Sequence, residues 1–247
     1  MIDICMLSCN KARLTRTSIE EIARRTQTPY RLLVLDNGSV DESPEILTEL
    51  RERGHLYWNT NRRENKGVHW GHNELLNGAQ SEPYYICTDS DIVPQNSAPD
   101  WLAQLIDLAE RHPEYASISL RPHVFIGDSA QQMFKDAAEV VERNWMGAWL
   151  RIMRTEVVRE VGGWNRKRIA PERNNEEKWI GRALRKAGWK VGVARDIHCI
   201  HLWGDPDKYD EDPWGYPPGI PHGHRDVWPP VHVYNWDRQG VDWETCQ

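Results

Sequence analysis

Two kinds of apolar pattern alternate over roughly the first 120 residues of this chain. Short continuous apolar runs are typical of buried strands, and segments with apolar residues every three or four positions are typical of amphipathic helices. We expect strands at 2–7, 30–35, 56–58, 84–88 and 115–120, and helices at 14–26, 44–53, 71–80 and 99–111. This alternation predicts an α/β fold with a mostly parallel central sheet and helices on both faces.

The rest of the chain is less regular. Strands are expected at 149–153 and 189–194, and helices at 155–161 and 174–187. Residues 121–144 show no clear pattern, and from residue 205 onward Trp, Pro, Gly and His dominate without periodicity. We therefore expect one domain over 1–204, with halves 1–120 and 121–204, and an irregular C-terminal extension over 205–247.

Charge and composition exclude some classes of protein. The net charge of −6 gives no overall attraction to nucleic acid or to anionic membranes. No stretch approaches the ~20 apolar residues of an integral membrane segment. The first residues lack the basic and apolar regions of a signal peptide, and the five cysteines include no CxxC pair. We expect a cytoplasmic protein with free thiols; its oligomeric state is not indicated.

Polar clusters follow three of the predicted strands. They are Ser8–Asn10, Asp36–Ser39 and Asp89–Asp91, and Glu176-Glu177 opens a late helix. In a doubly wound sheet the first three clusters meet at one crevice. Asp89 and Asp91 together can bind a hard divalent cation, which in turn can bind a diphosphate. The alternative for Asp-Ser-Asp is a solvated turn, because both residue types are common in turns.

The chain resembles the inverting family 2 glycosyltransferases of the GT-A fold. The motifs that carry the resemblance, in family order, are Met6–Lys11, Val34–Asp41, Asn65-Lys66-Gly67 with Asn73, Thr88–Asp91, Gly162–Asn165, and Glu176-Glu177 followed by Leu184–Val191. The resemblance covers roughly residues 2–204. It implies a Rossmann-like sheet with a nucleotide-sugar-binding half, 1–120, and an acceptor and catalytic half, 121–204.

The resemblance also implies roles in binding the nucleotide-sugar donor. Asp36 would accept a hydrogen bond from the nucleotide base, and Asp89 would lie near the ribose and the metal. Asp91 would be the direct ligand of Mn²⁺ or Mg²⁺, and His201 would complete the site, with His198 as a competitor. The other residues implied on the donor side are Ser8, Asn10, Asn65, Lys66 and Ser90.

The catalytic base and the acceptor side follow from two later motifs. Glu177 occupies the position of the family's general base, where an Asp is usual, and Glu176 remains an alternative. Acidic residues are also favoured at helix N-termini for electrostatic reasons alone. Gly163 and Trp164 match the family's acceptor side, where an aromatic ring can stack on a sugar.

We therefore predict a metal-dependent glycosyltransferase that moves a sugar from a nucleoside-diphosphate sugar, with UDP as the first choice, to an acceptor hydroxyl with inversion. The acceptor is not identified: a glycan, a lipid, a protein or a nucleic acid would each fit. A retaining GT-A transferase and a non-catalytic nucleotide-sugar-binding protein are the alternatives. A nucleotidyltransferase is disfavoured, because the first strand is not followed by a glycine-rich phosphate loop.

Overall fold

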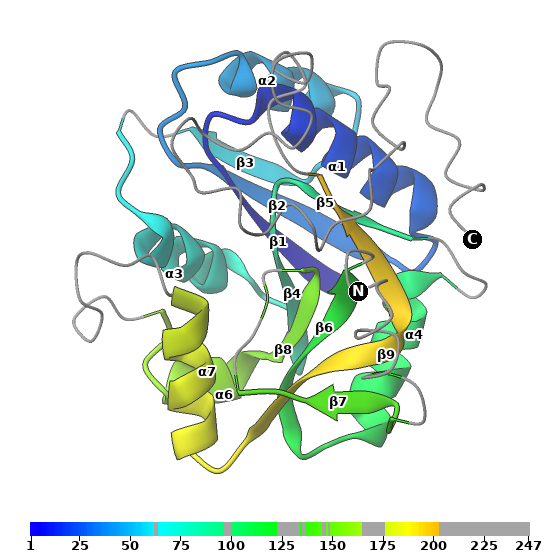
Figure 1. Cartoon of the computed structure of the whole chain (residues 1–247). Coiled ribbons are helices and arrows are strands. Elements are labelled where there is room, and N and C mark those ends of the chain that lie inside the picture. Colours follow the sequence, from blue (N-terminus) through cyan, green and yellow to red (C-terminus); the bar gives the residue numbers. More distant parts are fainter. Residues whose placement is uncertain are drawn as a thin grey trace, which may run out of the picture.

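Figure 1 shows a computed structural model of the chain. The structure describes residues 1–61, 64–95, 100–122, 134, 137–144, 147, 149–164 and 176–202. The predicted extension 205–247 lies outside these residues, and so does most of the segment 121–144 that showed no clear pattern.

The first half of the chain forms the parallel part of the sheet. Its elements are β1 (Ile2–Ser8), α1 (Ala12–Arg25), β2 (Tyr30–Asp36), α2 (Ser43–Glu52), β3 (Trp58–Asn61), α3 (Val68–Gly78) and β4 (Tyr84–Asp89). The four strands lie in the order β3-β2-β1-β4, and every neighbouring pair is parallel. β1, β2 and β3 are each followed by a helix that returns the chain to the start of the next strand, which is why the predicted alternation leads to this arrangement.

The second half extends the same sheet. Its elements are β5 (Ile92–Pro94), α4 (Trp101–Arg111), β6 (Tyr115–Pro122), β7 (Val140–Glu142), β8 (Arg151–Arg154), α6 (Thr155–Glu160), α7 (Glu176–Lys186) and β9 (Lys190–His201). In the described part of the chain the sheet has nine strands, in the order β3-β2-β1-β4-β8-β6-β9-β5 with β7 beside β9. Its antiparallel pairs all involve β8 or β9. The predicted fold class is confirmed.

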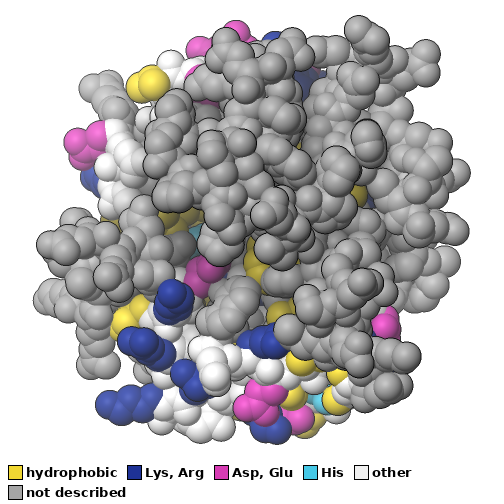
Figure 2. Space-filling model, in the orientation of Figure 1, with side chains coloured by type: hydrophobic (Ala, Val, Ile, Leu, Met, Phe, Trp, Pro, Cys, Tyr) yellow, Lys and Arg dark blue, Asp and Glu magenta, His cyan; other side chains and the backbone are white. Residues whose placement is uncertain are grey.

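Helices cover both faces of the sheet (Figure 1). On one face, strand residues such as Ile4 and Ile86 pack with apolar residues of α1, α2 and α4. On the other face, Cys5 and Cys87 pack with apolar residues of α3, α6 and α7. The alternation of side chains along each strand produces the two cores. The exposed face of α7 is basic and carries Lys178, Arg182, Arg185 and Lys186. Figure 2 shows a group of Lys and Arg side chains in the region where Figure 1 places α7.

Strand register brings the predicted polar clusters to one edge. Ser8 lies opposite Asp36, and Leu7 lies opposite Asp89 on the other side of β1. The carboxyl ends of β1, β2 and β4 are therefore level, so the side chains that follow them share one crevice, as expected for this class of sheet.

Four strands differ from the sequence-based expectation. β3 begins two residues later than its apolar run, and the short strands β5 and β7 were not predicted at all. β9 continues past Ala194 to His201, so His198 and His201 lie within the strand and not after it. Arg195 and Asp196 break the apolar pattern, but backbone pairing with β6, β7 and β5 does not depend on that pattern.

Candidate active site

Two loops, one after β2 and one before α3, are tied together by asparagine side chains. Asn65 Oδ1 accepts hydrogen bonds from Asn37 Nδ2 at 3.0 Å and from the Gly67 amide at 2.7 Å. The Lys66 amide donates to Asn37 Oδ1 at 3.1 Å. Gly38 has φ +81°, and a Cβ there would lie 2.4 Å from the carbonyl carbon of Glu64. The loop after β2 therefore requires glycine at this position, and Asn65 acts as a loop organiser.

Asp36 is fully buried at the end of β2 and uses one carboxylate oxygen within the protein. Its Oδ1 accepts from the amide of Ser39 at 3.3 Å and from the Ser39 hydroxyl. Its Oδ2 is buried and has no hydrogen-bond partner among the described residues. Burial raises the pKa of Asp36, and the hydrogen bonds from Ser39 oppose that shift. Asp36 therefore forms an Asx-type turn and still leaves an acceptor oxygen for a ligand.

Ser8 and Asn10 shape the neighbouring loop after β1. Ser8 Oγ is buried and lies 2.8 Å from Thr15 Oγ1. Asn10 has φ +52°, its amide donates to Ser39 Oγ at 2.8 Å, and its Oδ1 accepts from the Val40 amide at 2.8 Å. Asn10 therefore connects the loops after β1 and β2.

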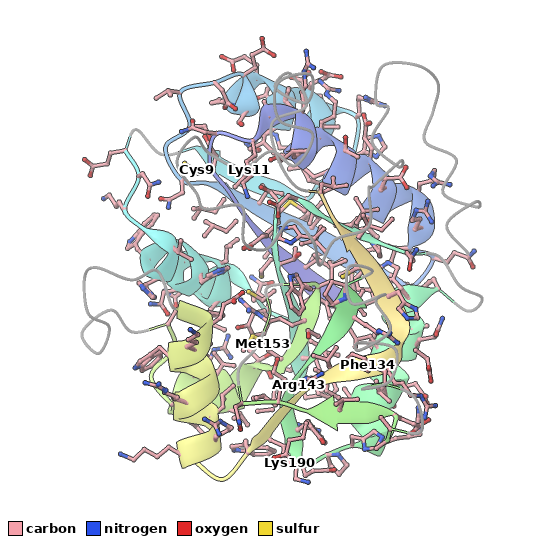
Figure 3. All side chains as sticks on the ribbon, in the orientation of Figure 1. Cys9, Lys11, Phe134, Arg143, Met153 and Lys190 are labelled. Atoms are coloured by element: carbon pink, nitrogen blue, oxygen red, sulfur yellow. The ribbon has the colours of Figure 1, made fainter. Side chains whose placement is uncertain are left out.

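Asp91 is the best partnered of the predicted metal ligands. It is 4% exposed; its Oδ2 lies 2.5 Å from Lys11 Nζ and its Oδ1 lies 3.5 Å from His201 Nε2. The amide of Leu202, the residue after β9, donates a hydrogen bond to the Asp91 carbonyl at 2.7 Å. Figure 3 shows Lys11 near the end of β1. His201 lies opposite Ile92, next to Asp91, whereas His198 comes three residues earlier in β9.

The two carboxylates of Asp-Ser-Asp have opposite electrostatic environments. Burial, together with the charges of Asp91 and Glu177, raises the pKa of Asp89 to about 7. Burial acts in the same direction on Asp91, but the interactions with His201 and Lys11 outweigh it and lower the pKa of Asp91 to about 2. Asp91 is thus ready to bind a cation at neutral pH, while Asp89 gains from one that offsets the neighbouring negative charges.

Glu177 lies in the first turn of α7 and contacts a buried arginine. Its Oε1 is 3.6 Å from Arg151 Nη1, and its side chain is 29% exposed whereas that of Arg151 is fully buried. The contribution of Glu177 to the raised pKa of Asp89 shows that the two carboxylates share one electrostatic environment. The side chain of Glu176 lies outside the described part of the structure.

Trp164 has no exposed surface, so its ring offers no open face to a sugar in this structure. The ring stacks on His72 at a centroid distance of 4.4 Å. Its backbone forms two hydrogen bonds with the Asn73 amide group, at 2.8 and 2.9 Å. Gly163 has φ +62°, and a Cβ there would lie 2.6 Å from Asn73 Oδ1. The Gly163-Trp164 motif therefore docks α3 against the end of α6.

The chain is similar to several known proteins. The family model described as "Glycosyl transferase family 2" matches residues 3–162. The chain belongs to this family. Two mycobacterial proteins, Uncharacterized protein Rv1520 of Mycobacterium tuberculosis and Uncharacterized protein Mb1547 of Mycobacterium bovis, are each 28% identical over 115 residues, which is 46% of this chain. The match covers 32% of the length of these relatives, so this chain corresponds to only part of them.

Solved structures share the fold of this family 2 chain. A mannosyltransferase from Pyrobaculum calidifontis, in complex with GDP-Man and Mn²⁺, has a TM-score of 0.64 at 16% identity, over 81% of this chain and 56% of that one. GalNAc-T7 with UDP, GalNAc and Mn²⁺ has a TM-score of 0.65 at 12% identity, over 81% and 43%. TarS of S. aureus with UDP-GlcNAc has a TM-score of 0.62 at 14% identity, over 85% and 63%. These likenesses establish the GT-A fold.

The family implies a divalent metal, and the described residues offer part of a site for one. Asp91 Oδ1 is buried without a hydrogen bond from the described residues, and His201 Nε2 lies 3.5 Å from it. Among the residues that the structure describes, no group of three His, Cys, Asp or Glu side chains is arranged around a cation. Two protein ligands fit Mn²⁺ or Mg²⁺ if diphosphate oxygens and water supply the rest, and Asp89 as a further ligand remains a prediction.

Several of the predicted residues meet at this edge, and others do not reach it as ligands. The residues at the carboxyl ends of their strands or next to them are Ser8, Asp36, Asp89, Ser90, Asp91 and His201. Glu177 comes from the first turn of α7, whereas Asn10 and Asn65 organise loops and Lys66 is exposed. The contacts of Lys11 with Asp91 and of Arg151 with Glu177 were not predicted from the sequence. Arg151 had one signal, a charged residue in an otherwise apolar predicted strand.

No helix in the described residues combines the length and the apolar character needed to cross a bilayer.

Proposed function

We propose that this chain is a metal-dependent glycosyltransferase that moves a sugar from a nucleoside-diphosphate sugar to an acceptor hydroxyl with inversion. The observation that carries the proposal is the convergence of four carboxylates, Asp36, Asp89, Asp91 and Glu177, at one edge of a family 2 fold. UDP is the preferred nucleotide, because two of the similar structures contain UDP or a UDP-sugar, although a third contains GDP-Man.

The donor is bound by its common parts. The unpartnered Oδ2 of Asp36 accepts a hydrogen bond from the nucleotide base, and Asp89 contacts the ribose. Asp91 and His201 would hold the divalent ion, with Lys11 as a second positive charge beside Asp91. The ion, when bound, neutralises the negative charge that develops on the leaving diphosphate.

The transfer itself needs one base. Glu177 removes the proton from the acceptor hydroxyl as the oxygen attacks the anomeric carbon, on the face opposite the diphosphate. The new carbon–oxygen bond forms as the bond to the diphosphate breaks, and the electron pair leaves with the nucleoside diphosphate. The Glu177 side chain is 29% exposed, so its carboxylate is not sealed inside the protein.

Nucleotide release from a panel of donors tests the proposal. UDP-glucose, UDP-N-acetylglucosamine, UDP-N-acetylgalactosamine and GDP-mannose are incubated with the protein and Mn²⁺, with and without chelator. We expect release from at least one donor, loss of release in chelator, and a decrease of ~10²–10⁴-fold in Glu177→Gln with unchanged calorimetric affinity for UDP.

Each alternative has its own outcome. Turnover in chelator would refute the metal dependence. A product whose anomeric configuration is that of the donor, as measured by NMR, would identify a retaining enzyme. Tight binding of a UDP-sugar with no release in the wild type, with water or with any glycan acceptor, would favour the non-catalytic binding protein.

A further inference from the structure

Arg151 is the most deeply buried arginine of the described chain. It is the first residue of β8, in the middle of the sheet between β4 and β6, and its side chain has no exposed surface. A positive charge removed from water in this way is unfavourable unless a negative group compensates it. The groups around Arg151 therefore indicate which negative charge compensates its guanidinium.

The guanidinium of Arg151 contacts the carboxylate of Glu177. Nη1 lies 3.6 Å from Glu177 Oε1, and Nη2 donates to Cys87 Sγ at 3.4 Å. The Arg151 Cζ lies 4.7 Å from the centre of the Trp164 ring. Cys87 is fully buried and its pKa is raised by burial, so the thiol brings no full charge. Glu177 is thus the carboxylate in contact with Arg151 in the described structure.

The backbone fixes Arg151 at the donor-binding edge. Arg151 is paired with Cys87, two residues before Asp89 on β4, and on the same face of the strand. The preceding residue, Leu150, has φ +46°, which is unusual for a branched side chain and sets the chain direction at the start of β8. The guanidinium is therefore held by the sheet and not by a mobile surface segment.

A second layer prevents the guanidinium from turning away. His72 stacks on Trp164 and lies 3.4 Å from Cys87 Sγ through Nδ1, so one buried cluster encloses Arg151. Burial and the charge of Arg151 keep the pKa of His72 well below its usual range, so His72 is neutral and adds no competing charge. Trp164 is fixed in turn by its two hydrogen bonds to Asn73.

We propose that Arg151 is a positioning residue, which holds the Glu177 carboxylate at the donor-binding edge through the buried cluster of Cys87, His72 and Trp164. The inference rests on the proposed function for the role of Glu177 as base. Arg151 contacts neither the donor nor the acceptor in this scheme. It acts through Glu177, and Trp164 serves the acceptor side as a support for this pair and not as a stacking surface.

A double-mutant cycle tests whether Arg151 acts through Glu177. The variants are Arg151→Met, Glu177→Gln and the combination, with Arg151→Lys as the conservative change. We measure kcat and KM for nucleotide release from the donor that the wild type uses, and UDP affinity by calorimetry. Arg151→Met should lower kcat by ~10²-fold, with UDP affinity within about twofold of wild type, and Arg151→Lys should recover part of the loss.

The decisive result is the combination. If Arg151 acts through Glu177, the double variant is no slower than Glu177→Gln within about threefold, because residues that act as a unit are not additive. Additive losses, or a loss of UDP affinity that accounts for the slower release, would overturn the inference. If Arg151→Met does not fold, the same cycle with Arg151→Lys gives the same decision.

Arg154 offers a matched control on the same strand. Its guanidinium donates to the carbonyl groups of Tyr115 at 3.0 Å and Ala109 at 3.3 Å, away from Glu177. Arg154→Met should reduce stability and leave kcat within about twofold of wild type.

A measurement without substrate separates this inference from the proposed function. Hydrogen exchange of the amides of residues 180–184 in α7 should become faster in Arg151→Met and Glu177→Gln, and stay unchanged in Arg154→Met. Unchanged exchange in Arg151→Met would overturn the positioning role even if the enzyme is active. Faster exchange in a protein that releases nucleotide from no donor would preserve the contact and refute the proposed function.

Discussion

At the scale of single residues, the site is defined by the carboxylate oxygens that remain available to a ligand. One oxygen of Asp36 accepts hydrogen bonds from Ser39, and the other is buried without a described partner. An unsatisfied buried acceptor is costly, so its persistence at a crevice is typical of a binding site.

Asp36→Ala should weaken UDP binding by about 1–3 kcal/mol, because the base loses a buried hydrogen bond. Calorimetry with UDP measures the change. Asp107→Ala is the control. Asp107 is an exposed residue on α4 that pairs with Arg111, so its substitution removes the same charge at a position away from the site. Equal UDP affinity in wild type and Asp36→Ala would remove Asp36 from the base pocket.

Asp89→Asn should stabilise the metal-free protein at pH 8. The pKa of Asp89 in the folded protein is about 7, above its ordinary value of 3.8, so ionisation of Asp89 opposes folding and stability falls as pH rises from about 4 to 7. We expect a gain of about 1–2 kcal/mol in the free energy of unfolding at pH 8, reduced from the full shift because Asp89 is only partly buried. Thermal unfolding in chelator from pH 4 to 8 measures it, and the gain should shrink as the pH falls.

Asp91→Asn should have the opposite sign at neutral pH. The lowered pKa of Asp91 means that its ionised form stabilises the fold above about pH 4, and that this contribution is lost as the pH falls through about 2. The Asn variant also leaves Lys11 without its carboxylate partner. If both Asn variants shift stability in the same direction at pH 8, the opposite environments inferred for the two carboxylates are wrong.

At the scale of elements, Asp100 joins two parts of the layer that covers one face of the sheet. It caps α4 by accepting from the amides of Leu102 at 3.0 Å and Ala103 at 2.9 Å. The same carboxylate accepts from the amides of Gln27 at 2.7 Å and Thr28 at 2.6 Å, in the turn between α1 and β2. One side chain therefore satisfies four backbone donors in two elements.

Asp100→Ala should lower the free energy of unfolding by about 2–4 kcal/mol, since it removes a cap and leaves further amides unpaired. Burial acts to raise the pKa of Asp100, but the amide hydrogen bonds outweigh it and lower that pKa. The ionised carboxylate therefore stabilises the fold at neutral pH, and this stabilisation is progressively lost below about pH 4. Urea unfolding at pH 7 and pH 3.5 measures the difference. UDP affinity of the folded variant should equal that of the wild type; a change would place Asp100 in the path between fold and site.

At the scale of the whole molecule, the proposed donor site is assembled from the ends of several strands. The loops after β1 and β2, the start of α3 and the turn after β4 all contribute. A ligand that binds this crevice stabilises the folded state by mass action, because the unfolded chain has no crevice.

UDP together with Mn²⁺ should therefore raise Tm, with a stabilisation of about 2.7 kcal/mol at a UDP concentration 100 times Kd. Chelator should reduce the shift, and adenosine diphosphate with Mn²⁺ should give a smaller one. Differential scanning calorimetry measures all three. An equal shift for adenosine and uridine diphosphates would contradict the choice of UDP, and the lack of any shift would contradict donor binding.

The sequence alone determined the fold class and the polar residues that the level ends of β1, β2 and β4 bring to one edge of the sheet. Apolar periodicity and the polar residues that end each run are local properties, and they were sufficient to predict the parallel strands and the cluster at Asp89–Asp91. The same locality explains the errors, because β5 and the second half of β9 depend on backbone pairing with distant strands.

Only the tertiary structure decided how the individual residues are used. It placed His201 and not His198 beside Asp91, gave Asp89 and Asp91 opposite pKa shifts, and buried Trp164. It also joined Arg151 to Glu177, which are 26 positions apart in the chain. Charge, burial and contact depend on neighbours that are distant in sequence, so the sequence could predict candidate residues one by one but not the contacts between them.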